Sequence, residues 1–269
     1  MHMLLIALLC AAVSDADSAR AVFAKAQKSV VTVKLVVKIS SNGHDSETKV
    51  EASGTVIDPS GLTVVPAAAV DPGAALRASL RARPGAPELK LESSVTSATL
   101  LLPDGTEVDA DVVLKDTDLD LAFLRPQEDG RTFDAVQLKP VKTLPQVLEQ
   151  VILVGRYGQT ASRQPWVELS RMRAVVKGPR IYGMVDSDGG DALGTVAYAM
   201  DGTPLGVFVT KTSSSGSDSR RMGGGNEHVI LRTADDVLEI AEQARKRPRP
   251  LPSTAVAPVS IPAPAPAKK

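Results

Sequence analysis

The chain has 269 residues, and its 31 Lys and Arg balance 31 Asp and Glu, so the formal net charge at pH 7 is zero. That balance argues against a nucleic-acid binder, which normally carries a basic excess or a basic face. Apolar residues make up 43%, enough for a packed core. The one cysteine, Cys10, lies in the N-terminal stretch, so we expect no disulfide, thiolate metal site or cofactor, and any chemistry must use oxygen or imidazole.

The first predicted element is an apolar leader. Residues 3–13 read MLLIALLCAAV, an apolar run that fits the core of a signal peptide and is too short to span a bilayer. We interpret residues 1–19 as a signal peptide or apolar leader, with small residues offering cleavage after Ser14 or after Ala19. Export to the periplasm or outside the cell follows from this interpretation. The alternative is an N-terminal helix that packs on the folded domain.

A short amphipathic helix is predicted over residues 18–28 (SARAVFAKAQK), and many short β-branched runs follow it. Gly, Pro, Asp and Ser separate these runs, a pattern typical of an all-β sandwich or barrel. Long loops are expected at 71–94 and 211–226. The runs that predict strands are 30–39, 52–57, 62–65, 98–102, 108–114, 119–124, 151–154, 168–176, 181–185, 194–200, 205–210 and 228–231.

The C-terminal part of the chain divides into a helix and a tail. Residues 233–246 read TADDVLEIAEQARK, with a threonine N-cap, acidic residues in the first turn and basic residues at the end, which predicts a helix. Residues 247–269 alternate Pro with Ala, Val and Ser, and we expect this tail to be extended and disordered. The folded domain is therefore placed at residues 20–246.

Four segments in one order resemble the Deg/HtrA-type trypsin-like serine proteases. Residues 52–65 (ASGTVIDPSGLTVV) are similar to the first hairpin of that family, and 104–113 (DGTEVDADVV) with 118–124 (DLDLAFL) are similar to its next strands. Residues 194–207 resemble the hairpin after the nucleophile, and 229–233 (VILRT) resemble the entry to the final helix. The resemblance implies an all-β fold of two chymotrypsin-like six-stranded β-barrels with a C-terminal helix.

The catalytic positions depart from the family pattern. Residues 65–70 (VPAAAV) place Ala68 where the family has its histidine, and Asp120 falls on the family's aspartate. Counting back from the turn at 201–202, residues 191–196 (DALGTV) place Leu193 at the nucleophile and Thr195 at a glycine. A serine protease needs a hydroxyl nucleophile and an imidazole base, and losing either costs about 10⁶-fold in turnover. The resemblance therefore implies no intact triad.

A displaced triad is the alternative for catalysis. Ser187 lies near two glycines but fourteen residues before Asp201, where the family spacing is eight, so it would need an insertion. The only histidines are His2 in the leader, His44 in a predicted polar loop and His228 just before the final strand. If active, the protein would be a serine endopeptidase of the trypsin-like class.

Two acidic features were weighed as binding sites. Asp120 without its histidine would bind a cation or an amine. The interpretation that we favour is that it accepts backbone or hydroxyl hydrogen bonds, or faces water. The run DSDGGD at 186–191 has carboxylates at alternate positions, as Ca²⁺ loops do, but lacks a downstream bidentate glutamate. We therefore expect no metal site.

The sequence favours an exported, catalytically inactive trypsin-like homologue, a pseudoprotease, that binds a peptide or protein partner in the cleft between the barrels. Edge strands beside such a cleft are suited to pairing with an extended peptide. The alternatives are the active endopeptidase with a displaced triad and a structural envelope protein that is anchored through its tail. No nucleic-acid partner and no membrane span are expected.

Overall fold

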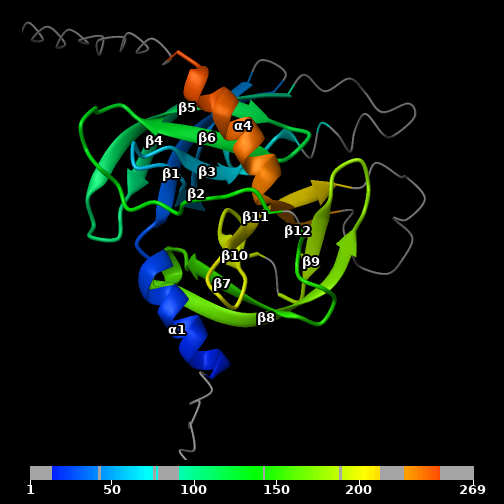
Figure 1. Ribbon diagram of the computed structural model, residues 1–269. Helices are drawn as coiled ribbons and strands as arrows, with labels where there is room; N and C mark the ends of the chain where they lie inside the picture. The colour runs from blue at the N-terminus through cyan, green and yellow to red at the C-terminus, as the bar shows by residue number, and fades with distance from the viewer. Residues whose placement is uncertain are drawn as a thin grey trace, which may run out of the picture.

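A computed structural model describes residues 14–41, 44–74, 77, 91–141, 143–187, 190–212 and 227–248. The predicted leader core, the Pro/Ala tail from residue 249, and residues 213–226 of the second long loop lie outside the described residues. The elements are two β-barrels with a helix before the first and a helix after the second (Figure 1). No helix among the described residues is long and apolar enough to cross a membrane.

The first barrel is a closed antiparallel sheet in the order β1-β2-β3-β6-β5-β4. Alternating apolar residues of its strands, such as Val33, Leu35 and Val37 on β1, point into a buried core. The helix α2 (Ala67–Val70), one turn long, follows β3 directly. The strands are β1 (Val30–Ser41), β2 (His44–Val56), β3 (Thr63–Pro66), β4 (Leu91–Leu101), β5 (Glu107–Asp116) and β6 (Leu121–Pro126).

The second barrel is closed in the order β10-β11-β12-β9-β8-β7. A 3₁₀ turn, η1 (Gln159–Ala161), lies between β7 and β8. One buried cluster includes Phe123 of the first barrel together with Ile152 and Val207 of the second, so the barrels share a core. The strands are β7 (Gln150–Arg156), β8 (Pro165–Val176), β9 (Tyr182–Val185), β10 (Val196–Tyr198), β11 (Pro204–Thr212) and β12 (Glu227–Thr233).

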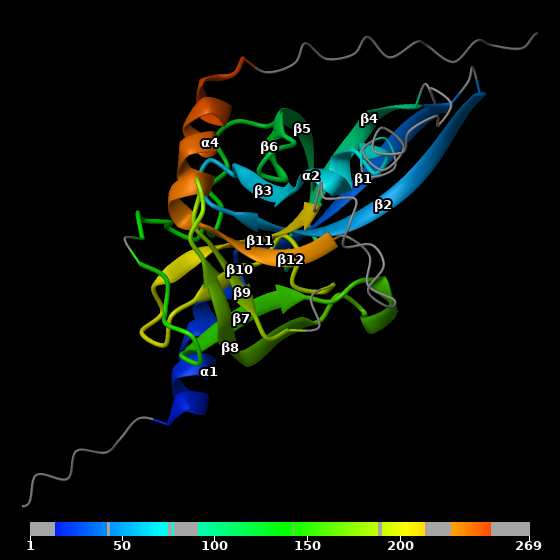
Figure 2. The same cartoon turned by 90° about the vertical axis from the view of Figure 1, so that its right-hand side faces the viewer.

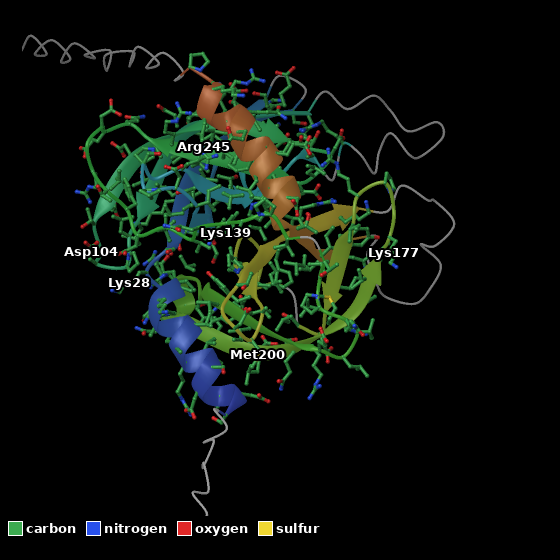
Figure 3. All side chains as sticks on the ribbon, in the orientation of Figure 1. Lys28, Asp104, Lys139, Lys177, Met200 and Arg245 are labelled. Carbon is green, nitrogen blue, oxygen red and sulfur yellow. The ribbon has the colours of Figure 1, made fainter. Side chains whose placement is uncertain are left out.

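The two flanking helices differ in how closely they follow the predictions. Helix α1 (Asp15–Ala26) begins three residues earlier than predicted, because the Ser14 hydroxyl accepts a hydrogen bond from the Asp17 N–H and caps the helix. Helix α4 (Ala234–Lys246) begins after its Thr233 N-cap, as predicted. It leaves the second barrel and lies across the first, where Arg245, labelled in Figure 3, pairs with Asp58 at 3.1 Å.

The carboxyl end of α4 is held by the first barrel. Arg125 of β6 donates from Nη2 to the Ala244 carbonyl at 2.6 Å and from Nη1 to the Arg247 carbonyl at 3.2 Å. Carbonyls in the last turn of a helix lack partners within the helix and attract a cation, so this arginine both caps and orients α4. The helix thereby fastens the two barrels together on the side seen in Figure 1.

The predicted all-β fold of two six-stranded barrels with a C-terminal helix is confirmed, and each predicted strand overlaps an observed one. Two strands are much longer than predicted. β2 begins at His44 rather than at residue 52, and β4 begins at Leu91 rather than at residue 98. Both extensions pair with β1, and the three strands reach beyond the barrel in Figure 2.

Candidate functional site: a cleft between the barrels

Asp120 lies between the barrels and is fixed by donors from both. It ends the turn before β6 with φ +54°, a left-handed conformation that is rare outside glycine. Its Oδ1 accepts from the Ala68 N–H at 3.0 Å in the first barrel. Its Oδ2 accepts from the N–H and the hydroxyl of Thr210 on β11, at 2.7 and 2.5 Å, in the second barrel. The predicted acceptor role of this carboxylate is therefore present, with three donors.

Burial dominates the electrostatics of Asp120. Removal from water raises the pKa of its carboxyl group above the ordinary value, and the bonds from Thr210 and Ala68 oppose this without cancelling it. The donors to this carboxylate, from Ala68 and Thr210, are all neutral. In an intact triad an imidazole N–H would also donate to the carboxylate.

Ala68 lies on α2, directly after β3, with its methyl group exposed. The Asp120 carbonyl accepts from the neighbouring Ala67 N–H at 3.1 Å, so the backbone of α2 is held against Asp120 by two bonds. In Figure 2, α2 lies above the ends of β11 and β12, where the barrels face each other. A methyl group in this position can neither accept nor donate a proton.

Leu193 precedes a sharp turn into β10. Gly194 has φ +79°, donates its N–H to the Phe208 carbonyl at 2.9 Å, and accepts from the Thr55 hydroxyl at 2.9 Å. A Cβ at Gly194 would lie 2.0 Å from the Ser53 carbonyl oxygen, so only glycine fits here. The turn is thus held against the first barrel, and Leu193 lines the space between the two barrels.

Thr195 stands where the resemblance places a glycine, and the structure accommodates it. Its side chain is fully buried, and its hydroxyl donates to the Ala192 carbonyl at 2.6 Å. Because the buried hydroxyl is satisfied, the substitution leaves the turn intact.

Ala68 and Leu193 line one cavity of about 350 Å³ between the barrels, which we call the cleft. Its volume is within the range of ligand sites in proteins. Other lining residues come from β2 and from the start of the β7–β8 loop, including Tyr157 and Gly158. The resemblance to the HtrA-type proteases implied that Ala68 and Leu193 belong to one site, and both line this cleft.

Ser187 lies beside the cleft but in a separate cavity. That cavity, of about 280 Å³, shares Tyr157, Gly190 and Asp191 with the cleft and is otherwise lined by Trp166, Glu168, Ser187 and Ala192. No histidine is among the described residues that line either cavity. His44 begins β2 at the outer end of the β1–β2 hairpin, and His228 pairs with Lys211 in the β11–β12 ladder.

The described residues contain no cluster of three or more His, Cys, Asp or Glu side chains that could hold a metal ion. Of the acidic run at 186–191, residues 188 and 189 lie outside the described part. Sequence reasoning missed Thr210, whose bond to Asp120 joins positions ninety residues apart, and no local pattern marks such a partner.

A model of the trypsin-like peptidase domain matches residues 52–207. The chain belongs to the trypsin-like peptidase family. In fold it is similar to a solved HtrA-type protease, AlgW, whose structure includes a tripeptide, with a TM-score of 0.58 and 14% identity. The alignment covers 87% of this chain and 64% of that one, so this chain spans less than two thirds of its structural neighbour. A comparison with curated proteins found no match.

Proposed function

We propose that this trypsin-like domain is a pseudoprotease that does not cleave peptides and binds an extended peptide or a protein partner in the cleft. The observation that carries the proposal is the hydrogen bonding of Asp120, whose Oδ1 meets the Ala68 N–H and whose Oδ2 meets Thr210. This arrangement supports assigning Asp120 to the orienting carboxylate and Ala68 to the position of the base. Leu193, before the left-handed Gly194, then takes the position of the nucleophile.

Ala68 and Leu193 carry neither an imidazole nor a hydroxyl, so no side chain at these two positions can transfer a proton to or from a scissile peptide bond. Methyl and isobutyl groups supply neither a nucleophile nor a base. For a displaced triad built on Ser187, no histidine is found among the described residues that line the adjoining cavities, so the inactive form is the better supported.

Peptide binding is supported by an unpaired strand edge beside the cleft. β2 pairs with β1 along its length but with β3 only at Thr55 and Val56, so one edge of residues 44–54 has no strand partner among the described residues. Glu51, Ala52 and Ser53 on this edge line the cleft. An extended peptide adds readily to such an edge through main-chain hydrogen bonds.

Export of the protein remains part of the proposal and rests on the apolar run at 3–13. Of the two expected cleavage points, the one after Ala19 would cut α1 at a buried residue, whereas the one after Ser14 would remove only the N-cap and keep residues 15–26 together. Sequencing the N-terminus of the secreted protein would distinguish them.

Selection of a displayed library of random twelve-residue peptides against the purified protein tests the binding function. Selected peptides should bind the wild type, and Ala68→Trp should abolish binding because the indole would obstruct the cleft. Ala24→Trp, at an exposed alanine on α1, is the matched control and should bind like the wild type. The proposal fails if no peptide is enriched, or if Ala68→Trp, shown to be folded by circular dichroism, binds as well as the control.

A further inference from the structure

Arg156, the last residue of β7, is a half-buried cation with no anionic partner among the residues that the structure describes. Its Nε donates to the Val30 carbonyl at 3.2 Å, where β1 begins. Its two terminal nitrogens donate to the carbonyls of Arg163 at 2.8 Å and Gln27 at 3.3 Å. All three acceptors are neutral, and burial lowers the pKa of the guanidinium with no carboxylate opposing that effect.

Arg156 lines a second cavity as well as the cleft. This cavity, of about 380 Å³, lies between the β4–β5 turn of the first barrel and the β7–β8 loop of the second, and we call it the arginine pocket. Thr32 and Arg156 line both cavities, so the pocket and the cleft are neighbours. A chain lying in the cleft along β2 therefore lies beside Arg156.

The described lining of the arginine pocket contains two cations and no acidic side chain. Arg163 is the second cation, and Glu51, outside this pocket, neutralises it through a 2.6 Å ion pair. The charge of Arg156 is the one left uncompensated. A charge that is partly removed from water without a counterion is costly, so an incoming anion gains more here than at an exposed arginine.

The hydrogen-bonding capacity of Arg156 also favours binding of an anion. A guanidinium carries five N–H groups, and one on each nitrogen of Arg156 donates to a carbonyl, so one on each terminal nitrogen has no acceptor among the described residues. Two donors on the terminal nitrogens suit the two oxygens of a carboxylate. The three carbonyl bonds hold the guanidinium in place before any ligand arrives.

We propose that the arginine pocket binds a carboxylate of the peptide that occupies the cleft, so that the partner is an acidic peptide rather than any extended chain. The inference rests on the proposed function and adds a chemical class to it. The carboxylate comes from an acidic side chain or from the C-terminus of the peptide.

Two series of labelled twelve-residue peptides built from Ala, Val and Ser test the proposal by fluorescence anisotropy. One series steps a single Glu through every position and the other steps Gln, with both ends capped. At one or two adjacent positions Glu should bind about ten- to a hundredfold more tightly than Gln, the range for a hydrogen bond to a charged group. Uncapped peptides then show whether a free C-terminus replaces the side chain.

Variants locate the effect. Arg156→Gln should remove the preference for Glu, whereas Arg20→Gln, at an exposed arginine on α1 with 72% of its side chain accessible, should keep it. The comparison of Glu with Gln peptides on the wild type needs no variant, so it tests the preference for a carboxylate even if Arg156→Gln does not fold. Equal binding of both series, with free C-termini giving no gain, would overturn the inference while leaving cleft binding intact. If neither series nor the uncapped peptides bind, the arginine pocket is refuted, and failure of library selection as well would refute the proposed function.

Discussion

Gly194 holds the turn after Leu193 against the first barrel. Replacing it by alanine should destabilise the protein far more than replacing Gly105, a glycine in another turn. Gly194 has φ +79° and Gly105, in the β4–β5 turn, has φ +86°. An L-residue in this region costs about 1 to 2 kcal/mol. Gly105→Ala should cost only this amount, because nothing lies within 4 Å of its Cβ position.

Gly194→Ala carries a second cost, because its Cβ would lie 2.0 Å from the Ser53 carbonyl oxygen. Relief requires the turn to move more than an ångström, which strains or breaks the bonds that Gly194 makes with Phe208 and Thr55. Two neutral hydrogen bonds at about 1 kcal/mol each, added to the conformational cost, give about 3 to 4 kcal/mol.

Urea unfolding of the wild type and both variants at pH 7, followed by circular dichroism, measures these free energies. Gly105→Ala controls for the conformational penalty alone. Equal destabilisation by the two substitutions would refute the close contact between Gly194 and Ser53 and, with it, the locked turn.

Two further predictions concern Asp120. Thr210→Val removes the 2.5 Å hydroxyl bond to the carboxylate and should lower the free energy of unfolding by about 1.5 to 3 kcal/mol, while Thr210→Ser keeps it; equal stability of the two variants in urea would contradict this. Since burial raises the pKa of Asp120, the folded chain takes up a proton while the unfolded chain is still ionised. The stabilisation from that proton is complete below the unfolded pKa and is lost as pH rises through the folded pKa. Wild type should therefore gain stability relative to Asp120→Asn as pH falls from 7 toward the ordinary aspartate pKa of 3.8, and a constant difference would count against the effect.

The barrels could be predicted from local pattern because most strands alternate apolar and polar residues between clear turns. The first part of β2 could not. Residues 44–49 read HDSETK, all polar and exposed, and the sequence there is typical of a loop. This segment is a strand because β1 provides hydrogen-bonding partners along its whole length, which is a tertiary cause.

Only those site residues that lie close in sequence to a motif could be predicted. Ala68 and Leu193 were assigned by spacing from neighbouring motifs, and they line one cleft. Thr210 and Arg156 were not found, because each acts through contacts with residues far away in sequence. The Thr210 bond spans ninety residues, and the bonds from Arg156 to Val30 and Gln27 span more than a hundred. Hydrogen bonding at such positions depends on how distant segments pack together, which no local pattern encodes.

The absence of proteolysis is tested most directly by reaction of the purified mature protein with a fluorophosphonate probe for serine hydrolases, alongside casein turnover. Wild type and Ser187→Ala, both shown to be folded, are compared with trypsin as the positive control. Our account predicts no labelling and no turnover in either form. Labelling of the wild type that disappears in Ser187→Ala would contradict it and would make Ser187 the nucleophile of an active enzyme.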